Sequence, residues 1–270
     1  AKERKQGKAN NSKNGEADLI IKHADIRRSL MNMKSLIEGQ RSLAFWVSQQ
    51  IDVSLNHSDS TIKQNANDMV SMMTPIIKSF FTDIGMELTN DAIQVFGGYG
   101  YTKDQGIEQL FRDNRITPIY EGTNSVQAID LVYRKILNNK IYNNYIDQIT
   151  KEIQEYDKNK ELTLFVQKFQ KYVELLNNFT SWLSEKNKNS KDDVSAACND
   201  YLKVLGYLGL AHSWLKILKV SYEKYDTNKS FFEDKINTAT YYFDKILPRA
   251  QSHYLSAITG SKSMMKANFN

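Results

Sequence analysis

The 270-residue sequence has few residues that interrupt or cross-link a chain, with three prolines, twelve glycines and one cysteine. The single cysteine, Cys198, excludes a disulfide within the chain and suits a reducing compartment. Few glycines and prolines, and no clear run of alternating β-branched residues, argue against a β-sheet protein and predict an all-α fold. No signal peptide and no apolar run long enough to span a membrane are seen, so we expect a protein of the cytoplasm or of an equivalent reducing compartment.

The sequence also lacks a concentrated block of one charge, although its formal net charge is +5. Its lysines are dispersed among Glu, Asp and Asn along amphipathic segments, and no basic stripe with interleaved aromatics occurs. Dispersed charge is typical of a solvated face, so no nucleic-acid partner is expected. No cluster of His, Cys or Asp lies beside His212, and no metal site is expected.

Apolar residues recur at helical spacing through most of the chain and predict long amphipathic helices. Those expected in the first half cover residues 17–56, 61–96, 106–115 and a stretch from 123 onward. Ser58 or Ser60 is the expected N-cap of the second of these. About three more helices are expected in the second half, over residues 161–186, 194–225 and 231–261. The prediction is therefore an antiparallel helical bundle followed by an additional helical segment.

An Asn- and Tyr-rich connector, NNKIYNNYIDQ, separates the two halves and quickly becomes helical. We expect a domain boundary near Lys140, which divides the chain into residues 1–140 and 141–270. In the second half, the stretch YLKVLGYLGLAHSWL is apolar nearly all round and should be the most buried. Its Gly206 and Gly209 would permit close helix packing, and His212 is expected to be a hydrogen-bonded core residue. Cys198 is expected to be buried and inert.

The stretch from Gln94 to Gln127 combines glycines, an acidic residue and a helix start. Glu121 lies just before a helix that begins near Thr123 or Asn124, where unpaired backbone N–H groups can hold an anionic oxygen. A carboxylate buried there would have its pKa raised toward that of a general base. From spacing alone, however, a capping turn with a solvated glutamate is the commoner interpretation.

Three phrases in the first half, QVFGGYGYTKD, RDNRITPIYEGTN and LIEGQRSLAFW, resemble the C-terminal helical domain of the acyl-CoA dehydrogenases. These flavoenzymes introduce a trans double bond between Cα and Cβ of acyl-CoA thioesters. The resemblance covers roughly residues 1–140, and the tail that follows fits the long-tailed branch, which includes the 3-methylmercaptopropionyl-CoA dehydrogenases. Members of the family normally carry a helical domain and a β-barrel before this point, so the chain resembles the C-terminal part of a longer protein.

The resemblance implies FAD as the cofactor, an acyl-CoA as the substrate, and a homo-oligomer (dimer or tetramer) that shares FAD sites. It also implies an electron acceptor, either an electron-transfer flavoprotein or oxygen. By the same resemblance Glu121 is the base that takes the α-proton while flavin N5 accepts the β-hydride, and its backbone N–H helps to polarise the thioester carbonyl. Tyr120 and Gly122 would border the thioester.

Further residues are assigned to FAD by the same resemblance. Thr123 and Ser125 match positions that touch FAD at the helix start, whereas Gln94 and Gly98 resemble residues that reach the FAD of a neighbouring subunit. Arg4 resembles the arginine set against the pyrophosphate of that shared cofactor. Two departures occur: Ser125 stands where relatives often have Glu, Gly or Gln, and Gly7 lacks the aromatic side chain of many relatives.

A second interpretation is a non-catalytic helical scaffold or oligomerisation module derived from the same family. The intact residues Glu121, Thr123, Gln94 and Arg4 count against a decayed site. However, the flavin-binding parts that precede this region in the family are missing from the sequence, so the chain alone is not expected to turn over.

Overall fold

The computed structural model describes residues 1–10, 12, 15–137 and 141–269 of the chain. Apart from one isolated antiparallel bridge between Lys5 and Leu19, all regular elements in these residues are helices, which confirms the predicted all-α fold. The elements of the first half are η1 (Ile20–Lys22), α1 (Ala24–Asn56), α2 (Ser60–Phe96), α3 (Gly98–Tyr101), η2 (Lys103–Gln105), α4 (Ile107–Asn114), α5 (Asn124–Asp130) and the π-helical turn η3 (Leu131–Ile136).

The tail is also helical, and its elements are α6 (Ile141–Tyr156), α7 (Thr163–Asn189), α8 (Lys191–Glu223), η4 (Tyr225–Thr227), α9 (Lys229–Tyr241), the π-helical turn η5 (Tyr242–Ile246), α10 (Arg249–Ala257) and α11 (Lys262–Met265). One prediction for this half is confirmed and one was wrong. The connector quickly becomes helical, because α6 begins at Ile141, whereas the helix expected over residues 231–261 is divided into α9, η5 and α10. The division lies near Pro248, which has no backbone N–H to donate to a continuing helix.

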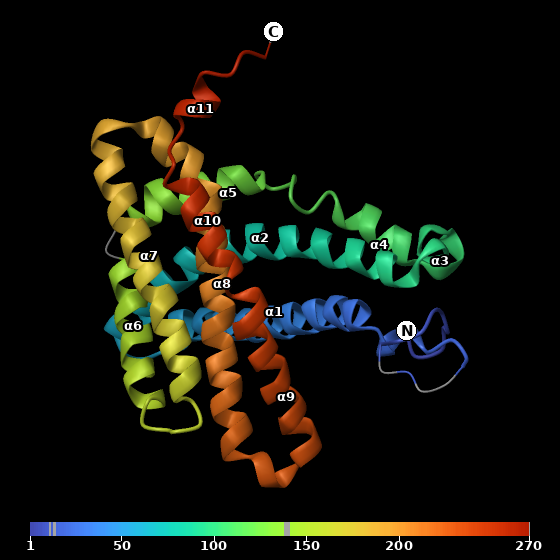
Figure 1. Ribbon diagram of the computed structural model, residues 1–270. Helices are drawn as coiled ribbons and strands as arrows, with labels where there is room; N and C mark the ends of the chain where they lie inside the picture. The colour runs from blue at the N-terminus through green and yellow to red at the C-terminus, as the bar shows by residue number, and fades with distance from the viewer. Residues whose placement is uncertain (11, 13–14, 138–140, 270) are drawn as a thin grey trace.

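Helices α1 and α2 form a long antiparallel hairpin (Figure 1). The first was predicted to begin at residue 17 but begins at Ala24, because His23 adopts an extended backbone (φ −77°, ψ 133°). The N-cap predicted at Ser58 or Ser60 was also wrong, since Asp59 accepts the backbone N–H groups of Thr61 (2.8 Å) and Ile62 (3.0 Å). An aspartate can satisfy two unpaired N–H groups at a helix start.

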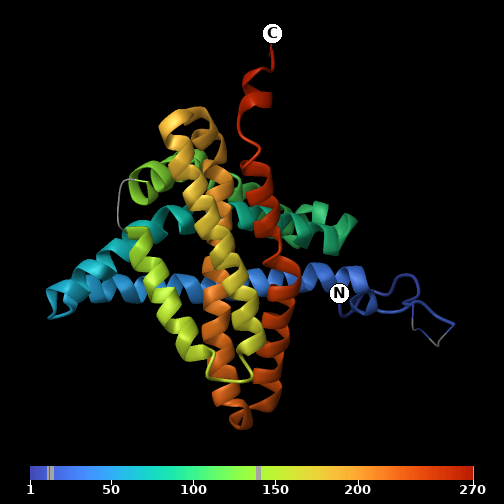
Figure 2. The ribbon, with the colours of Figure 1, turned by 60° about the vertical axis from the view of Figure 1, so that its left-hand side comes forward.

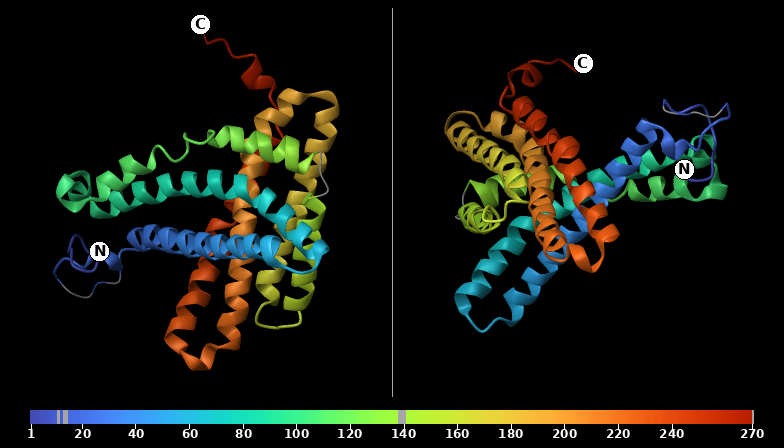
Figure 3. Two further views of the ribbon diagram at one scale, coloured as in Figure 1. Left: turned by 180° about the vertical axis from the view of Figure 1, so that it is seen from behind. Right: turned by 60° about the horizontal axis from the view of Figure 1, so that its bottom comes forward.

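The chain reverses at the far end of α2 and returns along the same helix. Gly97 ends α2 with φ +65°, a conformation that favours glycine, and α3 and α4 follow directly. The segment after α4 runs back beside α2 to α5, as the view from behind shows (Figure 3). This path places the N-terminal segment and the α3 turn at one end of the hairpin, and the start of α5 part way along it.

The tail helices α6 to α10 run across the α1–α2 hairpin (Figures 1 and 2). Helix α8 lies at the centre of the molecule, where it packs against α1, α2, α5, α7, α9 and α10. Every residue from 204 to 215 in this helix is buried, which confirms the prediction for that stretch.

A single hydrophobic core extends from the hairpin into the tail. Within it, His212 is 3% exposed and its Nε2 lies 2.7 Å from Glu152 Oε2, so the predicted hydrogen-bonded core histidine is confirmed. Cys198 is also buried, and burial raises the pKa of its thiol to about 12. The boundary predicted at Lys140 lies outside the described residues, and the division into two domains stays a prediction. Among the described residues, no helix has the length and apolar character that crossing a membrane requires.

Candidate functional site

The helix start predicted near Thr123 is confirmed. Thr123 is the N-cap of α5, and its Oγ1 accepts the backbone N–H of Val126 at 3.4 Å. The backbone N–H of Asn124 bonds to the carbonyl of Pro118 at 3.0 Å, which closes the preceding loop into a turn. The segment from Pro118 to Thr123 is therefore a defined turn, and it carries Glu121.

Glu121 and Gly122 are consecutive residues in the left-handed region, with φ +52° and φ +83°. Among the described residues, Glu121 is the one non-glycine with a positive φ. Such a conformation costs about 1–3 kcal/mol and persists where surrounding contacts enforce it. The side chain of Glu121 is exposed, so the described part of the chain does not bury it as expected.

Two side chains hold the carbonyl groups of this left-handed pair. The ammonium group of Lys78, in α2, donates to the carbonyl oxygen of Gly122 at 2.7 Å. The amide of Gln127, in α5, donates to the carbonyl oxygen of Glu121 at 3.2 Å. Both carbonyl groups of the pair are therefore fixed by donors from helices on either side of the turn.

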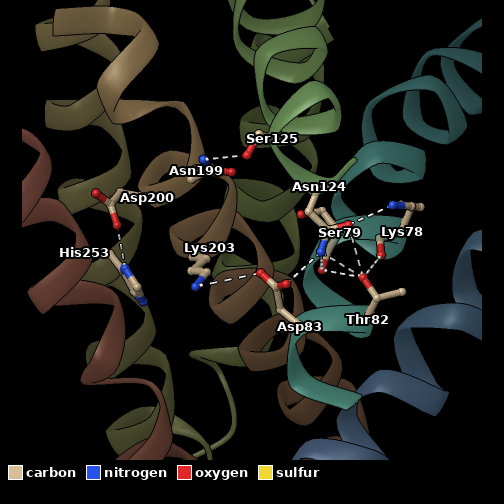
Figure 4. Close-up of polar contacts among 10 residues, drawn as sticks. All are labelled: Lys78, Ser79, Thr82, Asp83, Asn124, Ser125, Asn199, Asp200, Lys203 and His253. Carbon is tan, nitrogen blue, oxygen red and sulfur yellow. Dashed lines mark hydrogen bonds and ion pairs between the residues drawn. The ribbon is translucent and has the colours of Figure 1, made fainter. Parts of the chain in front are cut away.

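Asn124 anchors the start of α5 to α2 from a largely buried position, with 9% of its surface exposed. Its Nδ2 donates to the carbonyl of Ser79 at 3.1 Å and to Asp83 Oδ1 at 2.7 Å, and its Oδ1 accepts from Lys78 at 2.8 Å (Figure 4). Lys203, from α8, lies 3.8 Å from Asp83 on the other side. The tail therefore reaches the polar network that supports the turn.

Sequence reasoning missed Lys78 and Asn124 as supports of the site. The two residues are 46 positions apart, so no local pattern predicts that they meet. Ser125 also has a partner that was not foreseen, because its Oγ accepts from Asn199 Nδ2 of α8 at 3.3 Å (Figure 4). The hydroxyl predicted to touch FAD thus bonds to the tail in this chain.

Several large apolar side chains on the stretch from α4 to the first turn of α5 are exposed. They are Leu110, Ile116, Ile119, Tyr120 and Val126, each between 46% and 57% exposed. Exposed apolar side chains of this kind are typical of a binding site or of an interface with another domain.

A second group of predicted residues meets at the other end of α2. Arg4, Gln94 and Gly98 line one open cleft of about 1250 Å³, between the N-terminal segment and the α2–α3 turn. His23 contributes to this cleft, and its Nε2 lies 2.8 Å from the carbonyl of Gln6, which ties the N-terminal segment to the start of α1. A Cβ added at Gly98 would meet no atom within 4 Å, so this glycine faces open space.

The predicted site residues therefore form two groups in this chain. Tyr120, Glu121, Gly122, Thr123 and Ser125 lie together at the start of α5. None of them lines the cleft that holds Arg4, Gln94 and Gly98. One chain thus presents a turn with a fixed carboxylate and, separately, a cleft with an arginine. No group of acidic, His and Cys side chains that could hold a metal ion is found in the part of the chain described.

These features describe an all-α domain with two separate groups of polar residues, and comparison with known proteins shows its family. Residues 9–137 match the family described as "Acyl-CoA dehydrogenase, C-terminal domain". Residues 145–268 match the family described as "Acetyl-CoA dehydrogenase C-terminal like", which accounts for the tail. The chain belongs to the acyl-CoA dehydrogenase family.

Individual relatives point the same way. The chain is 36% identical to 3-methylmercaptopropionyl-CoA dehydrogenase of Ruegeria pomeroyi over 137 residues, which is 51% of this chain and 23% of that protein. It is 26% identical to a butyryl-CoA dehydrogenase of Syntrophomonas wolfei over 278 aligned residues, which cover 99% of this chain and 44% of that protein. The chain thus spans less than half the length of these relatives.

A solved structure shares the fold. The acyl-CoA dehydrogenase from Bacillus anthracis, complexed with FAD, superposes with a TM-score of 0.63 at 14% sequence identity. The alignment covers 95% of this chain and 46% of that protein, so both the hairpin and the tail have counterparts there.

Proposed function

We propose that the protein containing this chain is an FAD-dependent acyl-CoA dehydrogenase in which Glu121 removes the α-proton of an acyl-CoA thioester. The observation that carries the proposal is the fixed turn, where a carboxylate is presented in a left-handed conformation beside exposed apolar side chains. A carboxylate held in a defined direction is suited to accept a proton from a positioned carbon acid. Membership of the acyl-CoA dehydrogenase family supplies the class of substrate.

The residues next to Glu121 would orient the substrate. Tyr120 and Gly122 border the carboxylate along the chain and would border the thioester, and the backbone N–H of Glu121 would polarise the thioester carbonyl. Polarisation of this carbonyl acidifies the α-proton, which moves to the carboxylate as the double bond forms between Cα and Cβ. The exposed apolar side chains around the turn would contact the acyl chain or the domain that covers it.

The residues present are compatible with FAD. FAD, when bound, accepts the hydride from Cβ. Thr123 and Ser125 would lie against the cofactor used by Glu121, whereas Arg4, Gln94 and Gly98 line a cleft that has both a cation for a pyrophosphate and a bare glycine surface. Because the two groups of residues are separate, the cleft would serve the cofactor of a neighbouring subunit. This arrangement would make the enzyme a homo-oligomer, and we place it in the cytoplasm with an electron-transfer flavoprotein or oxygen as acceptor.

The visible absorption spectrum of the full-length protein, recorded before and after addition of acyl-CoA thioesters, tests the proposal. Flavin bands that bleach with one thioester would establish dehydrogenation and identify the acyl class. If no flavin binds and no thioester is consumed, a helical scaffold or oligomerisation role becomes the better account.

The role of Glu121 is tested by Glu121→Gln in the same full-length protein. This variant should retain bound FAD and lose about 10²–10⁴-fold in kcat, the usual contribution of a general base. Glu174→Gln, at an exposed position on α7, is the matched control and should leave kcat unchanged. Wild-type activity in Glu121→Gln would exclude this residue as the base.

A further inference from the structure

We infer that Lys78 is a positioning residue that sets the direction of the Glu121 carboxylate by fixing the turn around it. The inference rests on the proposed role of Glu121. It starts from the observation that the Lys78 ammonium bonds to the residue after Glu121 and lies over the ring of the residue before it. The ammonium lies 6.0 Å from the centre of the Tyr120 ring and 2.7 Å from the carbonyl oxygen of Gly122.

The contact with Gly122 acts directly on the backbone of the turn. A hydrogen bond from a charged donor is roughly twice as strong as one between neutral groups, and this bond joins α2 to a residue with φ +83°. With the Gly122 carbonyl held toward α2, the peptide between Gly122 and Thr123 cannot rotate freely. The Gly122 end of the left-handed pair is therefore held by a contact 44 residues away in the sequence, while Gln127 holds the carbonyl of Glu121.

The same ammonium is itself held in place. It donates to Asn124 Oδ1 at 2.8 Å, and Asn124 is fixed by its bonds to Ser79 and Asp83 (Figure 4). Lys78 is half-buried, which limits its alternative rotamers. A lysine with two acceptors of defined position acts as a rigid clamp between α2 and the turn.

The clamp leaves the carboxylate available for chemistry. Within the described residues, no ion pair between Lys78 and Glu121 is found, since the ammonium bonds to the Gly122 carbonyl and the Asn124 amide. A direct ion pair would stabilise the ionised carboxylate and weaken it as a base. Lys78 therefore orients Glu121 through the backbone without neutralising it.

Hydrogen exchange of the full-length protein tests the clamp without any requirement for activity. In Lys78→Met, backbone amides in peptides spanning residues 118–127 should exchange at least ten-fold faster than in the wild type, because the turn loses its anchor. Lys63→Met is the matched control, since Lys63 is also on α2, half-buried, and donates to a backbone carbonyl, that of Leu55 at 3.0 Å. This control should leave exchange in residues 118–127 unchanged.

Steady-state kinetics then tests whether the clamp matters for the reaction. Lys78→Met should lower kcat at least ten-fold, with bound FAD unchanged and KM for the acyl-CoA within three-fold of the wild type. A residue that acts only in folding would instead lower the amount of active enzyme and leave kcat per bound flavin intact. If Lys78→Met fails to fold, Lys78→Gln, whose shorter neutral side chain cannot replace the clamp, is measured with the same expectations.

The two measurements separate this inference from the proposed function. Unchanged exchange in residues 118–127 of the Lys78 variant would overturn the clamp, whatever the enzyme does. Faster exchange with unchanged kcat would show that the clamp holds the turn but does not position a base. An active Glu121→Gln variant would reject the proposed function, while the exchange result would still decide what holds the turn.

Discussion

Phe80 of α2 lies directly against Gly206 of α8, so closely that a Cβ on the glycine would stand 2.4 Å from the phenylalanine ring. The ring is 1% exposed and packs edge-on against Tyr207, with the ring centroids 4.9 Å apart. This contact joins the hairpin that carries the candidate site to the central helix of the tail. The tail is therefore packed into the same core as the hairpin.

Replacement of Gly206 by alanine should destabilise the chain by about 1–3 kcal/mol, the usual cost of overpacking a core. Alanine favours helix by about 1 kcal/mol relative to glycine, but the buried Phe80 ring, 2.4 Å from the new Cβ, would have to shift. Urea unfolding followed by circular dichroism measures the change. Gly209→Ala is the control on the same helix, because its Cβ would meet only the end of the Leu43 side chain, at 3.2 Å. An equal decrease in the free energy of unfolding in the two variants would contradict the role of the Phe80–Gly206 contact.

The buried pair of His212 and Glu152 should make stability depend on pH. Burial lowers the pKa of His212, so the imidazole is neutral in the folded chain. Burial alone would raise the pKa of Glu152, but the His212 hydrogen bond and the charge of Lys216, 3.4 Å away, lower it. Both groups thus bind protons more readily when the chain is unfolded.

The contribution of His212 to the free energy of unfolding is therefore fully present above about pH 6.5. It decreases as the pH falls below that value, by at most about 1.4 kcal/mol per pH unit. Protonation of Glu152 lowers the free energy of unfolding further at lower pH. Urea midpoints measured from pH 7.5 to 5.0 should fall in the wild type and fall less steeply in His212→Gln. His57→Gln, in the α1–α2 connection, should keep the wild-type slope, and a slope unchanged by His212→Gln would refute the assignment.

Gly98 offers a test of the cleft that is separate from catalysis. Alanine there should leave the stability of the chain unchanged, because its Cβ would meet no atom within 4 Å. In the assembled protein, however, a ligand seated against the bare glycine would meet the new methyl group. The dissociation constant for FAD should rise about ten-fold, which corresponds to about 1.4 kcal/mol.

The control for Gly98→Ala is Gly15→Ala, another glycine with open space around its Cβ position but outside the cleft. It should leave FAD binding unchanged when measured by fluorescence titration of the apoprotein. If Gly98→Ala binds FAD as tightly as the wild type, this surface of the cleft does not contact the cofactor.

Much of the fold could be predicted because helix formation leaves a local signature. The periodicity of α2, α7 and α8 gave their extents to within a few residues, and Thr123 identified the start of α5. The errors occurred where competing local signals were close together. The N-cap of α2 was predicted at Ser58 or Ser60 and not at Asp59, which lies between them. The π-helical turn η5 interrupts a stretch that the pattern predicts as one helix.

The candidate site was predicted less completely. The motif around Glu121 identified the carboxylate and its neighbours, but not the left-handed backbone at Glu121 itself. Nor did any pattern point to Lys78 or Asn124, because an isolated lysine or asparagine on a helix is usually a surface residue. Their roles depend on which side chain of α2 faces the turn.

The sequence by itself determined that this protein is all-α, that its central tail helix is buried, and that Glu121 precedes a helix start. Each of these follows from residues near one another in the chain, where spacing and capping act directly. Only the tertiary structure decided that Lys78 holds Gly122, that Arg4 and Gln94 share a cleft, and that Gly206 admits Phe80. Such contacts join residues 44 or more positions apart, and they exist only once the helices pack in one register.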